Sequence, residues 1–190
     1  SLIRDMGLIK KAAALANRDL RLINAKRAAA IIRAADEVIS GKFDDHFVVD
    51  VYQAGAGGSF HMNTNEVIAN RAIEFLGGSR GDYELCHPND HVNFGQSTND
   101  VFPTAMRLAA LMLFDDVIQS LGELERSFAR KGKAFDRILK SGRTHMMDAV
   151  PVRLGQEFAA YATALQRSGD LIRQAQDYLR ELGLGGSAVG

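Results

Sequence analysis

The chain has 190 residues, of which 46% are hydrophobic and 24% charged, so it is able to bury a core and its composition does not indicate disorder. Its 23 Lys and Arg residues balance its 23 Asp and Glu residues, which argues against a nucleic acid or an anionic membrane as its main partner. With a single cysteine, Cys86, and no apolar run near the roughly 18 residues of a membrane span, the reducing cytoplasm is the expected location.

Helical periodicity dominates the sequence, and it predicts an all-α fold with long polar loops. The first two helices are expected over residues 2–20 and 26–40. Residues 47–49 could form a short extended segment after them. Residues 63–66, Asn-Thr-Asn-Glu, have the pattern of an N-cap with an acidic third position, and they predict a helix from there to Leu76, where two glycines end it.

Two longer helices are expected in the second half of the chain. Residues 97–100, Ser-Thr-Asn-Asp, have the pattern of a second cap and predict a helix to about Leu139. The last helix shows a sustained heptad seam, which is typical of a long helix in a bundle. The seam consists of Leu154, Phe158, Tyr161, Leu165, Ser168, Ile172, Ala175, Leu179 and Leu182. An antiparallel pair of such helices cannot bury both seams alone, so further sequence or other subunits are expected to cover them.

Three polar loops precede helices and are rich in small hydroxyl, amide and imidazole groups, which hold a ligand without placing a charge in its site. They are residues 53–63, 87–99 and 141–148. The Gly-rich start of the first loop suits a carboxylate bound at a helix N-terminus or, more simply, a tight turn. Nucleotide binding is disfavoured there, because the loop lacks the lysine of a phosphate loop and follows no clear strand.

The other two loops leave similar alternatives. Residues 97–100 are explained by helix capping, by ligand contact, or by both at once. His87 and His91 have the spacing of metal ligands on a helix, but Pro88 and the lack of a third ligand favour a loop without metal. His145 is a candidate for proton transfer because an imidazole exchanges protons near neutral pH, although an isolated loop histidine is more often a surface residue.

Five blocks of sequence carry a resemblance to known proteins. They are residues 50–53 (Asp-Val-Tyr-Gln), 62–71 (Met-Asn-Thr-Asn-Glu-Val-Ile-Ala-Asn-Arg), 87–93 (His-Pro-Asn-Asp-His-Val-Asn), 96–100 (Gln-Ser-Thr-Asn-Asp) and 142–158, which opens with Gly-Arg-Thr-His. In this order they resemble the aspartase/class II fumarase family over nearly the whole chain. The resemblance implies an N-terminal helical domain, here residues 1–98, and a central helical bundle whose first part is residues 99–190. It also implies a homotetramer in which three subunits build each active site.

Matched position by position, the resemblance assigns roles to the polar loops. Substrate binding is implied for Gly57, Gly58, Ser59, Ser97, Thr98, Asn99 and Thr144. The catalytic histidine of the family corresponds to His145, which would help to orient or activate the amine or water side of the reaction. A secondary dicarboxylate site would use His87, Asn89 and Asp90. No metal and no organic cofactor are implied, and the expected partner is a small dicarboxylate.

The implied reaction is the reversible anti-elimination of ammonia from L-aspartate to give fumarate. Tyr52 and residues 55–57, 96–100 and 148–151 look more like aspartases; class II fumarate hydratase and a non-catalytic assembly fragment are the alternatives. The chain is expected to be the first part of a longer lyase, because the family's loop with the catalytic serine, which acts as the base, is absent from these 190 residues. The chain alone is therefore expected to be inactive.

Two positions depart from the family pattern. Gly58 stands where the family has threonine, and His61 stands where it usually has asparagine. Either Ser59 or His61 could replace the lost hydroxyl contact. The substitutions leave open whether the substrate is ordinary aspartate or malate.

Overall fold

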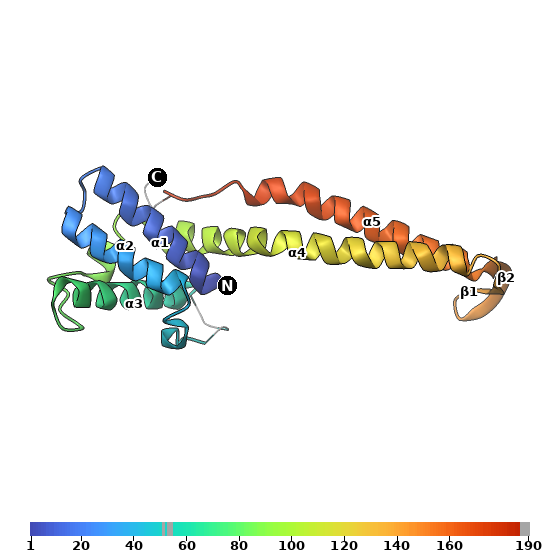
Figure 1. Cartoon of the computed structure of the whole chain (residues 1–190), viewed down its shortest axis with the longest axis horizontal. Coiled ribbons are helices and arrows are strands. Elements are labelled where there is room, and N and C mark those ends of the chain that lie inside the picture. The colour runs from blue at the N-terminus through green and yellow to red at the C-terminus, as the bar shows by residue number, and fades with distance from the viewer. Residues whose placement is uncertain (51, 53–54, 187–190) are drawn as a thin grey trace. The chain divides into compact units, whose positions relative to one another are not determined.

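The computed structural model describes residues 1–50, 52 and 55–186. The chain divides into two compact units, one formed by Ser1–Ala109 with the residues that follow Glu181, the other by Ala110–Glu181. The fold is mainly helical with one small two-stranded sheet, as the sequence predicts (Figure 1). None of the helices in the described ranges combines the length and the apolar character needed to cross a membrane.

Three helices form the core of the first unit. They are α1 (Leu2–Asp19), α2 (Ala25–Ile39) and α3 (Gly58–Leu76), and α2 lies between the other two (Figure 1). Asn24 caps α2 by accepting the N–H of Arg27, as expected for a helix that begins near residue 26. The fully buried side chains between α2 and α3 are Ala28, Ile31, Ala34, Ala35, Val38, Ile68, Ala69, Ala72 and Ile73. Many of them are alanines, so the helix backbones approach closely.

The start of α3 differs from the sequence prediction. The helix begins at Gly58, five residues before the expected cap, so the cap prediction for residues 63–66 is wrong. The polar side chains of this segment have other partners: Asn63 donates to the carbonyl of His46 and accepts the N–H of Val48, and Thr64 donates to the carbonyl of Phe60. The end at Leu76 is confirmed, with Gly77 as a left-handed C-cap.

The segment between α2 and α3 contains no strand within its described residues. A 3-10 helix, η1 (Asp44–His46), is followed by irregular chain over residues 47–50, so the extended segment expected at residues 47–49 is not formed. Phe47 packs instead against Phe60 of α3, with ring centroids 5.5 Å apart.

The second half of the chain contains two long helices and a hairpin. Helix α4 (Thr98–Ala134) starts in the first unit, and α5 (Leu154–Leu179) belongs to the second. Between them lie β1 (Leu139–Thr144) and β2 (Met147–Arg153), paired antiparallel. The third polar loop is therefore a β-hairpin and not an irregular loop, and α4 ends before Leu139 because Ile138 already accepts a hydrogen bond from the N–H of Leu154.

Within the second unit, α5 packs on α4 through part of the predicted seam. The seam residues Phe158, Leu165, Ile172 and Leu179 are partly shielded, and Phe158 contacts Phe128 and Phe135 of the preceding segment. Of the alternate seam positions, Tyr161 contacts Phe128 with ring centroids 5.6 Å apart, whereas Ser168 and Ala175 are exposed and the neighbouring Ala162 and Gly169 are buried. The small residues allow a tight crossing: a Cβ on Gly155 would collide with the carbonyl of Gly132.

Candidate functional site

A buried polar cluster lies at the centre of the first unit. Lys10 of α1 is fully buried, and its Nζ donates to Asn93 Oδ1 at 2.8 Å and to Gln96 Oε1 at 2.9 Å. The same Nζ lies 2.7 Å from Nε2 of the fully buried His61 in α3. On the other side of the ring, Nδ1 lies 2.7 Å from Oγ1 of Thr98, the first residue of α4. Four segments of the polypeptide thus meet at one series of linked hydrogen bonds.

Burial governs the ionisation of this cluster. Desolvation lowers the pKa of Lys10 to about 7, while the negative charge of Asp100 opposes part of the shift. Desolvation and then the positive charge of Lys10 lower the pKa of His61 to about 3. The imidazole of His61 is therefore neutral at pH 7, whereas Lys10 is close to the midpoint of its titration at this pH.

The N-terminus of α4 combines capping with exposed polar groups. Ser97 Oγ accepts the N–H of Asn99 at 3.3 Å, and Asp100 Oδ1 accepts the N–H of Ser97 at 2.8 Å, so both side chains cap the start of the helix. Asn99 is exposed, and Ser97 and Thr98 are partly exposed. The structure thus confirms capping and leaves hydroxyl and amide groups at the positive end of a long helix, where a carboxylate is favoured.

The Gly-rich segment forms a tight turn into α3. Gly55, Ala56 and Gly57 all have positive φ angles, of 88°, 49° and 87°. Gly57 is required there for a second reason, because a Cβ would collide with the ring of Phe102. Gly58 and Ser59 then form the first turn of α3, with Ser59 exposed. The first polar loop predicted from the sequence begins with Gln53 and Ala54, which lie outside the described residues.

His61 does not take the place of the missing threonine at residue 58. Its side chain is fully buried, and its two ring nitrogens face Lys10 and Thr98. The idea that His61 contacts a ligand directly is therefore wrong, because no part of the ring reaches the surface. Any influence on a ligand has to pass through Thr98.

The histidines of the second loop are held by the backbone. His87 caps a short π-helix, η2 (Pro88–Val92), and its Nδ1 accepts the N–H groups of Asn89 and Asp90 at 3.2 and 3.1 Å. His91 Nδ1 accepts the N–H of His87 at 2.7 Å. Across the described ranges, no three His, Cys, Asp or Glu side chains gather as a metal site would require. Asp90 is 76% exposed, so this segment faces solvent.

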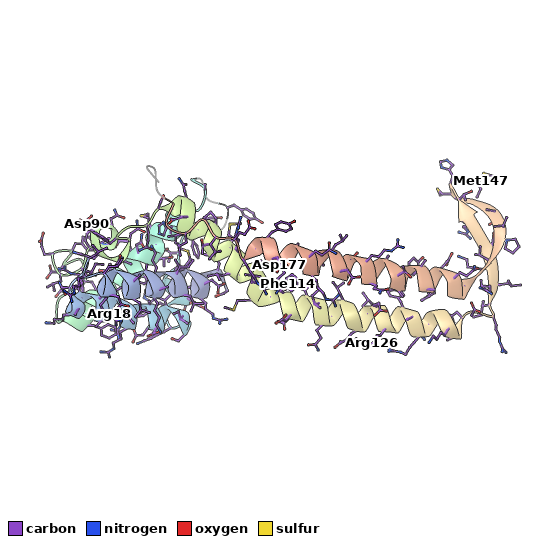
Figure 2. All side chains as sticks on the ribbon, turned by 90° about the horizontal axis from the view of Figure 1, so that it is seen from above. Arg18, Asp90, Phe114, Arg126, Met147 and Asp177 are labelled. Atoms are coloured by element: carbon purple, nitrogen blue, oxygen red, sulfur yellow. The ribbon has the colours of Figure 1, made fainter. Side chains whose placement is uncertain are left out.

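Thr144 and His145 lie in the second unit, at the turn of the hairpin. Thr144 pairs with Met147, which leaves His145 and Met146 as a two-residue turn with φ angles of 47° and 64°. Both φ values are positive, which matches a type I′ turn but is uncommon for side chains of this size. Thr144 and His145 are exposed, and the exposed Met147 is labelled on the hairpin in Figure 2. The other predicted site residues all lie in the first unit.

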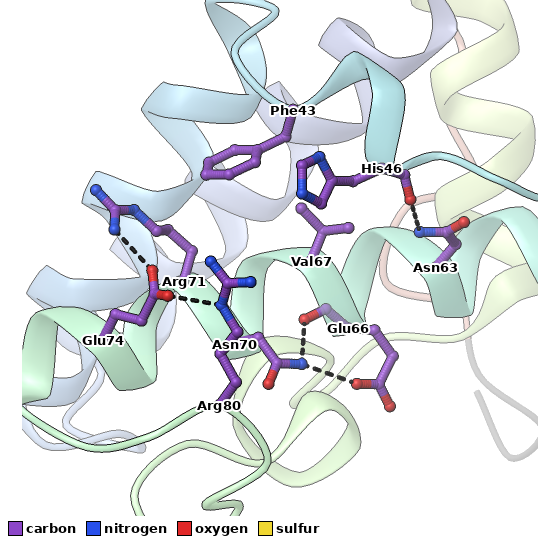
Figure 3. A pocket seen from close by; sticks show the side chains of 9 residues that line it. All are labelled: Phe43, His46, Asn63, Glu66, Val67, Asn70, Arg71, Glu74 and Arg80. Carbon is purple, nitrogen blue, oxygen red and sulfur yellow. Dashed lines mark hydrogen bonds and ion pairs between the residues drawn. The ribbon is translucent and has the colours of Figure 1, made fainter.

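A separate cavity of about 290 Å³ opens beside α3, and Figure 3 shows its lining. Three of its charged groups form ion pairs: Arg71 contacts Glu37 at 2.5 Å and Glu74 at 2.7 Å, and Arg80 contacts Glu74 at 2.6 Å. The Arg71 guanidinium lowers the pKa of Glu37 to about 2. None of the predicted site residues lines this cavity.

Sequence reasoning missed Lys10, Asn93 and Gln96. Lys10 belongs to an Ala/Leu/Lys-rich helix, where a lysine is usually taken as solvent-exposed. The available signal was its position, since Met6 and Ala14, four residues away on either side, are buried on the same helix face. A lysine on the apolar face of an amphipathic helix requires buried acceptors, and amide side chains provide them here.

Comparisons with known proteins agree with this geometry. A family model described as lyase matches residues 2–190. The class II fumarate hydratase of Halobacterium salinarum is 56% identical over 189 residues, and the aspartate ammonia-lyase of Bacillus subtilis is 47% identical over 189 residues. These alignments cover 99% and 100% of the chain, which spans about 40% of the length of either relative.

Solved structures show the same relationship. The fumarate lyase:delta crystallin structure from Brucella melitensis, in native form, matches with a TM-score of 0.87 and 50% identity, covering 97% of this chain and 43% of that one. The recombinant class II fumarase from Schistosoma mansoni matches with a TM-score of 0.86 and 41% identity, covering 100% of this chain and 40% of that one.

Proposed function

The chain belongs to the aspartase/class II fumarase family of lyases, and on this premise we propose that the whole protein converts L-aspartate reversibly to fumarate and ammonia by anti-elimination. The observation that carries the proposal is the N-terminus of α4, where Ser97, Thr98 and Asn99 present neutral donors at the positive end of a helix. The chain spans about 40% of the length of these relatives, so the proposal concerns the whole protein and not these 190 residues alone.

The chemistry explains why neutral donors suit this reaction. Removal of a weakly acidic proton beside a carboxylate places extra negative charge on that carboxylate, and fixed hydrogen-bond donors stabilise the charge as it develops. Hydroxyl and amide groups do so without neutralising a nearby base. We assign this role to Ser97, Thr98 and Asn99 and to the first turn of α3, and the family pattern gives Thr144 a substrate-binding role of its own.

The remaining roles follow the family pattern. His145 is proposed to orient or activate the amine, and Gly57, Gly58 and Ser59 to approach the substrate at the N-terminus of α3. His87, Asn89 and Asp90 are proposed to form a secondary dicarboxylate site. The division into an N-terminal domain over residues 1–98 and a bundle from residue 99 onward also stays a prediction.

The test is to measure turnover by the whole protein through the ultraviolet absorbance of the fumarate that forms. With L-aspartate as substrate, fumarate should appear, and ammonium added to fumarate should reverse the reaction. Thr98→Val should reduce kcat/KM by about tenfold or more, because a hydrogen bond to a charged group is lost. Gln119→Ala, at an exposed residue of α4 outside the predicted site, is the matched control and should leave turnover unchanged. Absence of turnover with aspartate would overturn the assignment.

The second candidate reaction is the hydration of fumarate to malate. It is favoured by one observation, the 56% identity to the class II fumarate hydratase of Halobacterium salinarum. The same assay with L-malate separates the candidates, since an aspartase should form fumarate only from the amino acid. Turnover of malate alone would transfer the assignment to fumarate hydratase.

A homotetramer is proposed as the working assembly. In the second unit, large apolar side chains are exposed on both helices. Monomeric proteins rarely expose so many apolar side chains close together, so this surface is expected to be covered by other subunits. These side chains are Met112, Leu113, Val117, Leu124, Tyr161, Leu171 and Tyr178. Light scattering of the whole protein should give the mass of four subunits, and a monomer at micromolar concentration would contradict the proposal.

A further inference from the structure

Resting on the proposed function, we propose that Lys10 and His61 are positioning residues, which together direct the hydroxyl proton of Thr98 outward to the substrate carboxylate. Neither residue reaches a ligand, because both side chains are fully buried. Their effect passes through one hydrogen bond at each side of the imidazole ring.

The first step is the direction of the hydrogen bond at Lys10. An ammonium group has three donors and no acceptor. Its Nζ has three partners at 2.7 to 2.9 Å, namely His61 Nε2, Asn93 Oδ1 and Gln96 Oε1. When Lys10 is charged, all three of its protons are used, and Nε2 of His61 can only accept.

The second step is the tautomer of His61. A neutral imidazole that accepts at Nε2 carries its proton on Nδ1 and donates there. The Nδ1 atom lies 2.7 Å from Thr98 Oγ1, so the threonine oxygen accepts this proton. The hydroxyl proton of Thr98 is then directed away from the ring. Since Thr98 is partly exposed at the start of α4, the proton is available to a carboxylate bound there.

When Lys10 is neutral, the hydrogen bonds from Lys10 through His61 to Thr98 run in the opposite direction. A neutral amine has two donors and one lone pair, so it can donate to Asn93 and Gln96 and accept from Nε2–H of His61. Nδ1 then accepts the hydroxyl proton of Thr98, which points inward. The cluster loses one proton in total, and the imidazole keeps one proton while changing tautomer. The substrate would lose a donor and face only an oxygen lone pair.

The groups that face Lys10 make this ionisation accessible near neutral pH. Among the described residues, the titratable groups that act on Lys10 are His61 from α3 and Asp100 from α4, and the amides of Asn93 and Gln96 are neutral. Desolvation lowers the pKa of Lys10 to about 7, and Asp100 limits the shift. The outward state of Thr98 is therefore favoured below about pH 7.

The test measures the binding of succinate, a dicarboxylate that cannot undergo elimination, to the whole protein by titration calorimetry. Lys10→Met and Thr98→Val should each weaken binding about tenfold, and the double variant should be no weaker than Thr98→Val. Lys11→Met, which removes an ion pair with Asp36 on the same helix, is the matched control and should bind like the unchanged protein. If the double variant loses affinity by the product of the two single losses, the two residues act independently on succinate binding, and the proposal is overturned.

A second measurement does not depend on Lys10→Met folding. In the unchanged protein, succinate affinity should fall about tenfold as pH rises from about 6 to 8, and Thr98→Val should lack this part of the pH dependence. Equal pH profiles in the two proteins would overturn the proposal. If succinate binds with the expected coupling but neither aspartate nor malate turns over, the positioning role stands and the proposed reaction fails. If succinate does not bind at all, both fail.

Discussion

Asp100 and Gly185 join the start of α4 to the end of the described chain. Asp100 Oδ2 accepts the backbone N–H of Gly185 at 2.8 Å, while Oδ1 accepts the N–H of Ser97 at 2.8 Å. The carboxylate is 2% exposed and acts electrostatically on Lys10. One side chain thus caps a helix, fixes a distant segment and balances a buried cation.

Replacing Asp100 should therefore be costly. Asp100→Ala is expected to lower the free energy of unfolding by about 2–4 kcal/mol, because it removes a cap and leaves Lys10 without its anion. Chemical denaturation of the whole protein measures this loss. Asp115→Ala removes an exposed carboxylate from the same helix and should change stability by less than about 0.5 kcal/mol. Similar losses in both variants would contradict the role of Asp100.

Gly57 and Gly58 should respond in opposite directions to alanine. Gly57→Ala places a side chain at a φ of 87° and against the ring of Phe102, so a loss of about 2 kcal/mol or more is expected. At Gly58, within α3, a Cβ would meet no atom within 4 Å, so Gly58→Ala should stabilise the helix by about 0.5–1 kcal/mol. Thermal unfolding of the two variants decides, and equal effects would disprove the prediction.

His61 should make the protein sensitive to acid. Its pKa falls from an ordinary 6.5 to about 3 in the folded state, so between these values the unfolded chain binds a proton that the folded chain does not. Stability should therefore fall as pH decreases through this window, by up to about 1.4 kcal/mol for each pH unit. Unfolding measured at a series of pH values should show a shallower acid slope in His61→Gln. An unchanged slope in His61→Gln would refute the prediction.

The 190-residue chain alone is expected to show no lyase turnover. By resemblance, the catalytic serine lies outside these residues, and Ser97, Thr98 and Asn99 bind but do not abstract the proton. The measurement is fumarate absorbance with aspartate and with malate, run beside the whole protein. Circular dichroism of the same sample distinguishes a folded, inactive chain from an unfolded one. Clear turnover by a pure sample would show that these residues contain the base.

Local patterns predicted most of the helices because their signals are short-range. Asn24 and the glycines after Leu76 fix the ends of α2 and α3 through neighbouring backbone groups. The start of α3 was not predictable in this way, because Asn63 and Thr64 bond to His46 and Phe60 and leave no cap. Asn63 was already engaged by a tertiary contact, and Thr64 by a carbonyl one turn earlier in the same helix.

The hairpin was missed for a different reason. A type I′ turn is usually signalled by Asn-Gly or a similar pair, whereas this turn consists of His145 and Met146. Its strands are also mostly exposed within this chain, so they lack the alternating pattern of a half-buried sheet. Capping at residues 97–100 was predictable because it depends on small polar side chains next to the helix start; a ligand role for the same residues stays a prediction. Lys10 was not found, because a lysine is usually solvent-exposed and only its place between Met6 and Ala14 on one helix face indicates that it points inward.

The two-residue turn fixes which face of the hairpin each side chain lies on. Side chains of a strand alternate between its faces, so Thr144 and Met147, which pair directly across the turn, share one face. Inserting one residue between Arg143 and Thr144, past the register shift that separates Ser141 from Arg143, would send the threonine to the opposite face, while inserting two would restore it one step further along. Changes in the length of this arm therefore act on Thr144 in discrete steps, and variants with an even number of added residues are the ones that keep its hydroxyl on its present side.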